Sequence, residues 1–441
     1  MRTLAFLLAL LGPAAAFAEG ERIVLIDIHD NSKTDDETVL SIARVHRGDT
    51  FTYALLEQAT ADLKSCGLFQ EVNLFTTPAK DGVRLTIVAK DKHSWVIAPT
   101  FYTTPGNIGG GVGFGENNLF GRNKKLLLYG QVATADSFFF GVYLDPSIAG
   151  SPFYWRIDTF LRREKITEFD SPDAFLGAPK PERESVMQYY NAGLLLGINL
   201  MKGLGFDMRF RGAKVLFRDV AWAEEADPAT HPDPPMPPGP DGWDVSLEWK
   251  LQYDKRASWN GVTTGKLLGV SYERSITSMG SDWDYWMTGA KMYLYKRILE
   301  NHNLVLKSYA GLGHHLPFSA EHTSGGTGLR GYSNRQFRGD LKVGGTLEYS
   351  LQLFWIKSFA FRALAFWDTT YTSFVMDDGN DHRSYLAGQT DDQINRWRNG
   401  VGAGFRVYVK SIVLPLLGVD VGYGLEAGTW NIYLAVGLTD F

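Results

Sequence analysis

The chain has 441 residues, with 44 Lys and Arg against 49 Asp and Glu, 47 glycines and 13% aromatic residues. Its weakly negative net charge of −5 disfavours a nucleic-acid-binding protein, and its one cysteine, Cys66, excludes an intrachain disulfide. The length allows two or more domains. Near-neutral hydropathy with many aromatic residues fits some soluble enzymes, and it is required of a membrane barrel, in which lipid-facing and lumen-facing residues alternate.

Residues 1–18 are predicted to be a signal peptide. Arg2 supplies a positive start, an apolar run follows over Leu4–Leu11, and Ala16-Phe17-Ala18 is an A-x-A cleavage site. The mature chain should therefore begin near Glu19. The run is too short to span a bilayer as a helix, and no later stretch of about 18 apolar residues predicts a transmembrane helix.

Residues 19–92 are predicted to form a small periplasmic α/β domain in the order strand, helix, helix, strand, strand. Ile23–Ile28 is apolar and β-branched, and Thr34 with Glu37 fits a capping box at the start of the first helix. Gly67 can close the second helix. The last two strands should meet at Asp81-Gly82, a tight-turn dipeptide.

Residues 93–441 are predicted to form a transmembrane β-barrel, because the hydrophobic period changes to two. In Val245–Tyr253 every second residue is apolar, and the intervening residues are polar. A soluble sandwich would alternate in the same way. These runs, however, reach about ten residues, which suits strands tilted across a bilayer, whereas soluble strands are more often five or six residues long. About 16 such segments follow one another, which predicts an antiparallel barrel of that size.

The connections between these segments alternate between short and long, as turns and outer loops do in membrane barrels. Met201–Leu204 and Glu300–Asn303 are short, whereas Ala223–Asp241 and Pro317–Asp340 are long. The Ala223–Asp241 segment is dense in proline, which cannot pair within a sheet, so it is predicted to be an extended outer loop.

Three stretches together resemble the BamA and TamA superfamily of outer-membrane insertases and transporters. Leu63–Phe69 looks like part of one POTRA module, the periplasmic domain type of that family, and Gly115–Gly121 is similar to an early turn of its barrel. The most specific match is Gly328-Leu329-Arg330-Gly331-Tyr332, which looks like the family signature [V/L]-R-G-[F/Y] in the long sixth loop.

The resemblance implies that this loop folds back into the lumen, where the arginine of the motif bonds carboxylates on the strand wall. Glu348 and Asp368 lie in the polar registers of their predicted strands, so the alternation alone points both carboxylates inward. A planar guanidinium between two carboxylates can make several charge-assisted hydrogen bonds. We therefore expect Arg330 to be bound by Glu348 and Asp368. The alternative is a solvated loop arginine above a wet channel.

The seam that closes the barrel is predicted to be weak. Pro99 lies inside the first barrel segment and lacks an amide hydrogen, so it removes a bond from the strand ladder. Gly437, in the last segment, weakens the other side. The chain ends at Phe441, an aromatic end that is common among outer-membrane barrels. Alternatively, Pro99 marks the start of the barrel below the membrane, where no pairing is needed.

Other candidate sites are weaker. Gly326–Gly331 satisfies G-x-G-x-x-G, but neither flank predicts the strand and helix that a dinucleotide site requires. His314, His315 and His322 do not repeat a ligand spacing, so we expect no metal there. Asp377–Asp381 lacks the spacing of an EF-hand and is predicted to be a solvated acidic loop.

No catalytic nucleophile with its base is visible, so we predict neither an enzyme nor a cofactor. The resemblance implies an assembly factor that inserts β-barrel proteins into the outer membrane through an openable seam between the first and last strands. The alternative is a transporter that secretes a dedicated protein through the lumen; transporters of the two-partner type usually carry two POTRA modules and a plug helix. Expected partners are unfolded outer-membrane or secreted client proteins, outer-membrane lipid and a periplasmic or inner-membrane accessory protein.

Overall fold

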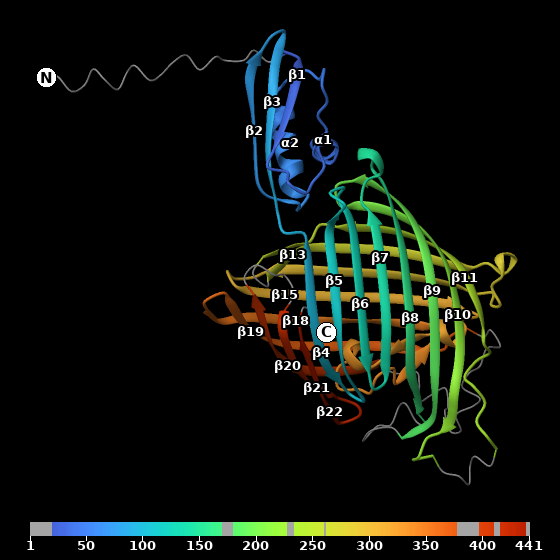
Figure 1. Cartoon of the computed structure of the whole chain (residues 1–441). Helices are drawn as coiled ribbons and strands as arrows, with labels where there is room; N and C mark the ends of the chain where they lie inside the picture. The colour runs from blue at the N-terminus through green and yellow to red at the C-terminus, as the bar shows by residue number, and fades with distance from the viewer. Residues whose placement is uncertain are drawn as a thin grey trace. The chain divides into compact units, whose positions relative to one another are not determined.

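The computed structural model describes residues 20–169, 180–226, 233–259, 262–376, 397–409 and 415–437 (Figure 1). The predicted signal peptide, the acidic loop at 377–381 and Phe441 lie outside these residues. The chain divides into two compact units. The first contains the residues up to Trp95 together with Glu116–Lys125 and Asp145–Ser151, and the second contains the rest of the barrel.

The first unit contains a small α/β fold with the predicted element order. Its elements are β1 (Ile23–His29), α1 (Asp36–Ala43), α2 (Tyr53–Ser65), β2 (Phe69–Ala79) and β3 (Gly82–Asp91). The three strands form one sheet in the order β1-β3-β2, with β1 parallel and β2 antiparallel to β3. Val39 and Leu63 pack with Leu85 and Ile87 in a fully buried core.

The start of α1 differs from the prediction. The capping box at Thr34 and Glu37 is wrong: Asp35 is the N-cap residue and makes no side-chain cap bond. The Thr34 hydroxyl donates instead to the carboxylate of Asp91, which lies at the end of β3. A distant carboxylate thus takes the hydroxyl that local spacing had assigned to the helix. The end of α2 is as expected, because Gly67 follows it with a φ of +77°.

In the described part of the chain, sixteen long antiparallel strands close into a barrel, which confirms the predicted fold class. A three-residue strand, β12 (Ala257–Trp259), continues β11 along the same neighbour. The long strands are β4 (Trp95–Thr104), β5 (Asn107–Leu119), β6 (Lys124–Ala133), β7 (Asp136–Asp145), β8 (Phe153–Phe169), β9 (Pro181–Met201), β10 (Leu204–Trp222), β11 (Gly242–Asp254), β13 (Val262–Ser275), β14 (Trp286–Arg297), β15 (His302–His314), β18 (Leu341–Ile356), β19 (Phe359–Ser373), β20 (Trp397–Val409), β21 (Pro415–Gly424) and β22 (Thr429–Val436).

The two faces of the barrel wall differ as the period of two predicts. Outward-facing Leu251, Val270 and Ile432 are 41%, 54% and 62% exposed, whereas inward-facing Asp368 and Asp420 are fully buried. Apolar side chains therefore stand on the lipid side, and charged ones stand in the lumen. No helix in the described residues is long and apolar enough to cross a membrane.

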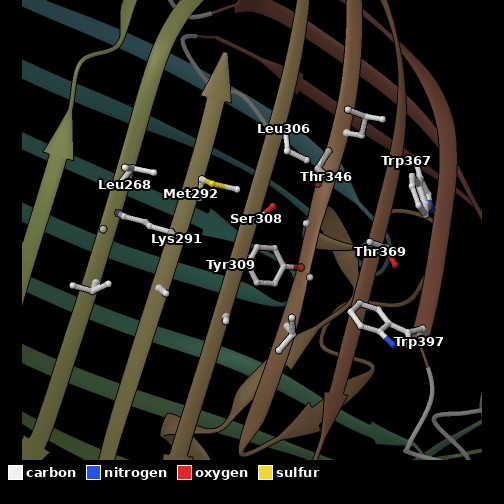
Figure 2. A pocket seen from close by; sticks show the side chains of 18 residues that line it. Leu268, Lys291, Met292, Leu306, Ser308, Tyr309, Thr346, Trp367, Thr369 and Trp397 are labelled. Carbon is white, nitrogen blue, oxygen red and sulfur yellow. The ribbon is translucent and has the colours of Figure 1, made fainter. Parts of the chain in front are cut away.

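The outer face of the wall carries a shallow apolar depression across β13–β20, with a volume of about 630 Å³ (Figure 2). Ser308 and Gly345, which have little or no side chain, line it. Met292 stands on one side, and Trp367 and Trp397 stand on the other. The side chains of these three residues are 38–51% exposed. The depression therefore lies on the lipid side of the wall, outside the lumen.

Candidate functional site

The segment between β15 and β18, residues 315–340, is the loop that the sequence singled out. It contains a two-stranded ribbon, β16 (His322–Ser324) and β17 (Phe337–Gly339), and a short 3-10 turn at Gly326–Gly328. That turn lies where the G-x-G-x-x-G spacing occurs. It has no flanking βαβ unit, so the dinucleotide interpretation is excluded for these residues.

Arg330 is the centre of the site. Its Nε and Nη2 donate to the two carboxylate oxygens of Asp368 at 2.8 and 2.9 Å, and its Nη1 donates to Asp420 at 2.9 Å. The guanidinium also lies 3.2 Å from the ring centre of Phe366. Arg330 is 4% exposed, so its charge is removed from water and balanced by carboxylates on β19 and β21.

The second carboxylate differs from the prediction. Glu348 stands on β18 in the register of Thr346, whose hydroxyl donates to Asp368, so it belongs to the expected lumenal face. The hydrogen bonds from the Arg330 side chain nevertheless go to Asp368 and Asp420. The loop lies over β19–β21, and this position brings Arg330 to β21.

Asp420 is shared between two arginines. Arg406 on β20 donates to both of its oxygens, at 2.5 and 2.9 Å. Sequence reasoning missed Asp420 and Arg406, although a signal was present. Asp420 is the one carboxylate in a register of glycines, opposite Val419 and Val421. Asp368 was identified in the same way, as a carboxylate in the register opposite to apolar residues of its strand.

Glycines allow the loop backbone to lie directly on the wall. Gly331 has a φ of +104°, and a Cβ atom added there would lie 2.2 Å from the backbone nitrogen of Gly424. A Cβ atom on Gly400 would lie 2.0 Å from the carbonyl oxygen of Arg330. Gly328 differs, because a Cβ atom there would meet nothing within 4 Å. Only the second glycine of the motif is therefore required by the packing.

The other two motif residues hold the loop from the side. Leu329 and Tyr332 are almost fully buried in one cluster with Phe337 and Ala427. The Tyr332 hydroxyl donates to Glu426, in the turn between β21 and β22. On β22, the Tyr433 hydroxyl accepts a hydrogen bond from the Gly331 amide at 3.1 Å. The motif is thus bound to β19, β21 and β22 together.

The seam between β22 and β4 closes the barrel. Its described pairs are Leu434↔Thr103, Ala435↔Tyr102 and Val436↔Phe101, next to Gly437, where the described part of the last strand ends. The neighbouring hairpin of β21 and β22 pairs continuously from Leu417↔Val436 to Gly424↔Thr429.

Pro99 and Gly437 lie opposite each other across the seam, next to the described pairs. A Cβ atom on Gly437, whose φ is +103°, would lie 2.4 Å from the carbonyl oxygen of Pro99, so this carbonyl faces β22. The carbonyls of Ala98 and Thr100 face glycines of β5 instead. Since the N–H and C=O of one strand residue point to the same side, the donor that proline lacks is missing from the seam edge.

No group of three or more His, Cys, Asp or Glu side chains suited to a metal is present among the described residues. The rings of His314 and His315 lie 4.1 Å apart between their centres. His322 lies in β16, where Gly311 of β15 faces it.

A closed antiparallel barrel with an apolar outer face and a charged lumen defines an outer-membrane β-barrel protein. The model of the Omp85 superfamily domain matches residues 118–409, and the chain belongs to this superfamily. No curated protein sequence matches the chain significantly.

Solved structures agree on the fold. BamA from Haemophilus ducreyi lacking POTRA domains 1–3 is similar with a TM-score of 0.68 at 15% identity, covering 95% of this chain and 84% of that one. CdiB from Acinetobacter baumannii and CdiB from Escherichia coli each give a TM-score of 0.64 at 14% identity and cover 95% of this chain, with 74% and 77% of their own chains covered.

Proposed function

We propose that this protein inserts β-barrel proteins into the outer membrane through a seam that opens between β4 and β22. The observation that carries the proposal is the proline on the β4 edge of this seam, because the N–H that Pro99 lacks would face β22. A barrel strand that enters lipid must satisfy its backbone amides, since each unpaired group costs several kcal/mol in hydrocarbon. An edge that opens easily can offer those partners by strand addition.

The lumenal loop supports this function by stiffening one flank of the seam. Arg330, Gly331 and Tyr332 contact β19, β21, β22 and the turn before β22, as their hydrogen bonds show. Such a braced flank resists deformation. Opening is then expected to move β4 away from a wall that keeps its shape.

The small α/β domain is proposed to be a single POTRA-like module that lies in the periplasm. Its sheet has β2 at one edge, and Phe75 on this strand is 48% exposed. An exposed strand edge can bind an extended client or an accessory protein by strand addition. Unfolded outer-membrane proteins, lipid and a periplasmic or inner-membrane accessory protein are the proposed partners.

The test is a disulfide across the seam. Phe101 and Val436 are directly opposed and both point outward, so Phe101→Cys with Val436→Cys should meet the geometric requirement for a disulfide. The background is Cys66→Ser, although burial already raises the pKa of the Cys66 thiol and makes it less reactive. In proteoliposomes, oxidation should abolish insertion of an unfolded client barrel, and reductant should restore it.

A matched control places the same disulfide within one hairpin. Val421 and Ile432 are opposed on β21 and β22 and also point outward. Val421→Cys with Ile432→Cys should keep full activity when oxidised, because this pair does not bridge the seam. Full activity of the oxidised Phe101–Val436 barrel would contradict seam opening. It would favour the alternative function, secretion of a dedicated protein through the lumen.

A further inference from the structure

A second arginine of the lumenal loop contacts a different part of the wall. Arg335 forms an ion pair with Glu164 on β8, with 2.8 Å between its Nε and a carboxylate oxygen. The same Glu164 oxygen accepts from Arg162 at 2.9 Å, and Arg162 binds both oxygens of Asp136 at 2.8 and 2.7 Å. Two carboxylates and two guanidiniums thus form one continuous ion network that reaches from the loop to β8 and β7.

Burial and backbone conformation indicate that this contact is built into the loop. Glu164 is 1% exposed, so its charge has little access to water. Arg335 has a φ of +52°, a left-handed conformation that non-glycine residues seldom adopt. The loop therefore accepts backbone strain at the residue that reaches Glu164.

The loop touches the same side of the barrel at one further place. Phe318 packs edge-on against Phe217 of β10, with ring centres 5.7 Å apart. Arg338 lies 3.5 Å above the Phe318 ring and donates to Glu321 at 2.7 Å, a contact within the loop itself. Arg335 is therefore the loop residue that pairs directly with β8, and Arg338 lies over the ring that contacts β10.

Two arginines in the middle of the loop bind opposite flanks of the seam. Arg330 binds β19 and β21, which lie on the β22 side of the seam, whereas Arg335 binds β8, which is the fifth strand on the β4 side. We propose that Arg335 and Glu164 are positioning residues that make the loop a strap across the lumen, which holds the β4 flank close to the β22 flank. The inference rests on the proposed seam function and adds its regulation.

The contact between Arg335 and Glu164 is the one that breaks when the strap releases. Arg330 makes three side-chain hydrogen bonds to two carboxylates and a fourth from its amide, while Arg335 makes one ion pair with Glu164. The second oxygen of Glu164 has no hydrogen-bond partner among the described residues. When the strap lets go of Glu164, the β4 flank can swing outward while the loop stays on the β22 flank.

The test measures amide hydrogen exchange of Phe101–Thr103 and Leu434–Val436 in the full-length protein without client. Glu164→Gln and Arg335→Gln should each raise exchange at the seam about tenfold or more, the equivalent of one lost hydrogen bond to a charged group. Arg335→Lys should stay close to wild type, since it keeps a cation at the site. Arg163→Gln is the matched control, because this neighbouring arginine of β8 pairs with the exposed Asp219, and it should leave seam exchange unchanged.

Protection of the β9–β10 ladder, measured in the same samples, shows that each variant is folded. Wild-type exchange at the seam in both Glu164→Gln and Arg335→Gln would overturn the strap, as would an equal rise in Arg163→Gln. The readout is independent of insertion. If the oxidised Phe101–Val436 barrel stays active while seam exchange depends on Glu164, the strap stands and the proposed insertion route falls.

Discussion

At the scale of single residues, the site is a buried cation with a partner for each of its guanidinium nitrogens. Removing one member of a buried ion pair leaves an uncompensated charge and costs about 3–5 kcal/mol, less where water reaches the site. Arg330→Ala should therefore lower the heat stability of the folded barrel and the activity of the protein. The shift of the folded band on a gel, as a function of temperature, measures the change in stability.

Substitutions of the three lumenal carboxylates near Arg330 provide a control for that prediction. Asp368→Asn and Asp420→Asn each remove an acceptor of Arg330 and should destabilise the barrel strongly. Glu348→Gln should have a smaller effect, because the hydrogen bonds of the Arg330 side chain go elsewhere. If Asp420→Asn were as mild as an exposed surface substitution, the assignment of Asp420 as the second carboxylate would be in error.

The two glycines of the motif should respond differently to alanine. Gly331→Ala forces a Cβ atom to within 2.2 Å of Gly424 in a left-handed conformation, so we expect a loss of more than about 1–3 kcal/mol of stability. Gly328→Ala places its Cβ atom in open space and should stay within about 0.5 kcal/mol of wild type. Thermal unfolding of both variants side by side tests the pair, and equal losses would contradict the packing account.

At the scale of elements, the face that each strand residue takes can be tested directly. Leu251 on β11 is 41% exposed on the outer face, and Gln252 follows it on the lumenal face. Leu251→Arg should cost about 2–4 kcal/mol if the site lies near the middle of the bilayer. Gln252→Arg, with the same new charge, should be tolerated. Unfolding in denaturant from lipid vesicles measures both, and a neutral Leu251→Arg would contradict the lipid-facing assignment.

The seam edge offers a gain-of-pairing variant. Pro99→Ala supplies the missing N–H on the side that faces β22 and should strengthen the seam. We expect slower client insertion together with slower amide exchange of Phe101. Unchanged exchange and activity would favour the alternative interpretation, in which Pro99 lies below the paired part of the barrel.

The period of the sequence predicted most elements, and the errors have physical causes. Strands and faces follow from alternation, which is a local property. The acceptors of Arg330 depend on which strands the loop lies over, and no local pattern encodes that position. The capping box failed for the same reason, because the Thr34 hydroxyl has a better partner in Asp91, far along the chain. Local sequence rules do not predict hydrogen-bond partners that are distant in the sequence.

At the scale of the whole barrel, a proline lies on the β4 edge of the seam, and one loop binds the wall on both sides of the seam. A ladder that lacks a donor is easier to open than a complete one, since each ladder bond contributes to the barrier. The proposed insertion route rests on this weak edge. A barrel that only conducts substrate through its lumen has no use for a weak seam.

Crosslinking of a client during insertion is the most direct test. A photoreactive residue is placed in turn at Phe101 and Thr103 on the β4 edge, and at Tyr309 and Thr346 in the lumen, and an unfolded client barrel is added to proteoliposomes. If the seam opens, Phe101 and Thr103 should crosslink to the terminal strands of the client while it inserts, and the lumenal positions should give few crosslinks. Strong crosslinks from Tyr309 and Thr346, with none from the β4 edge, would contradict it.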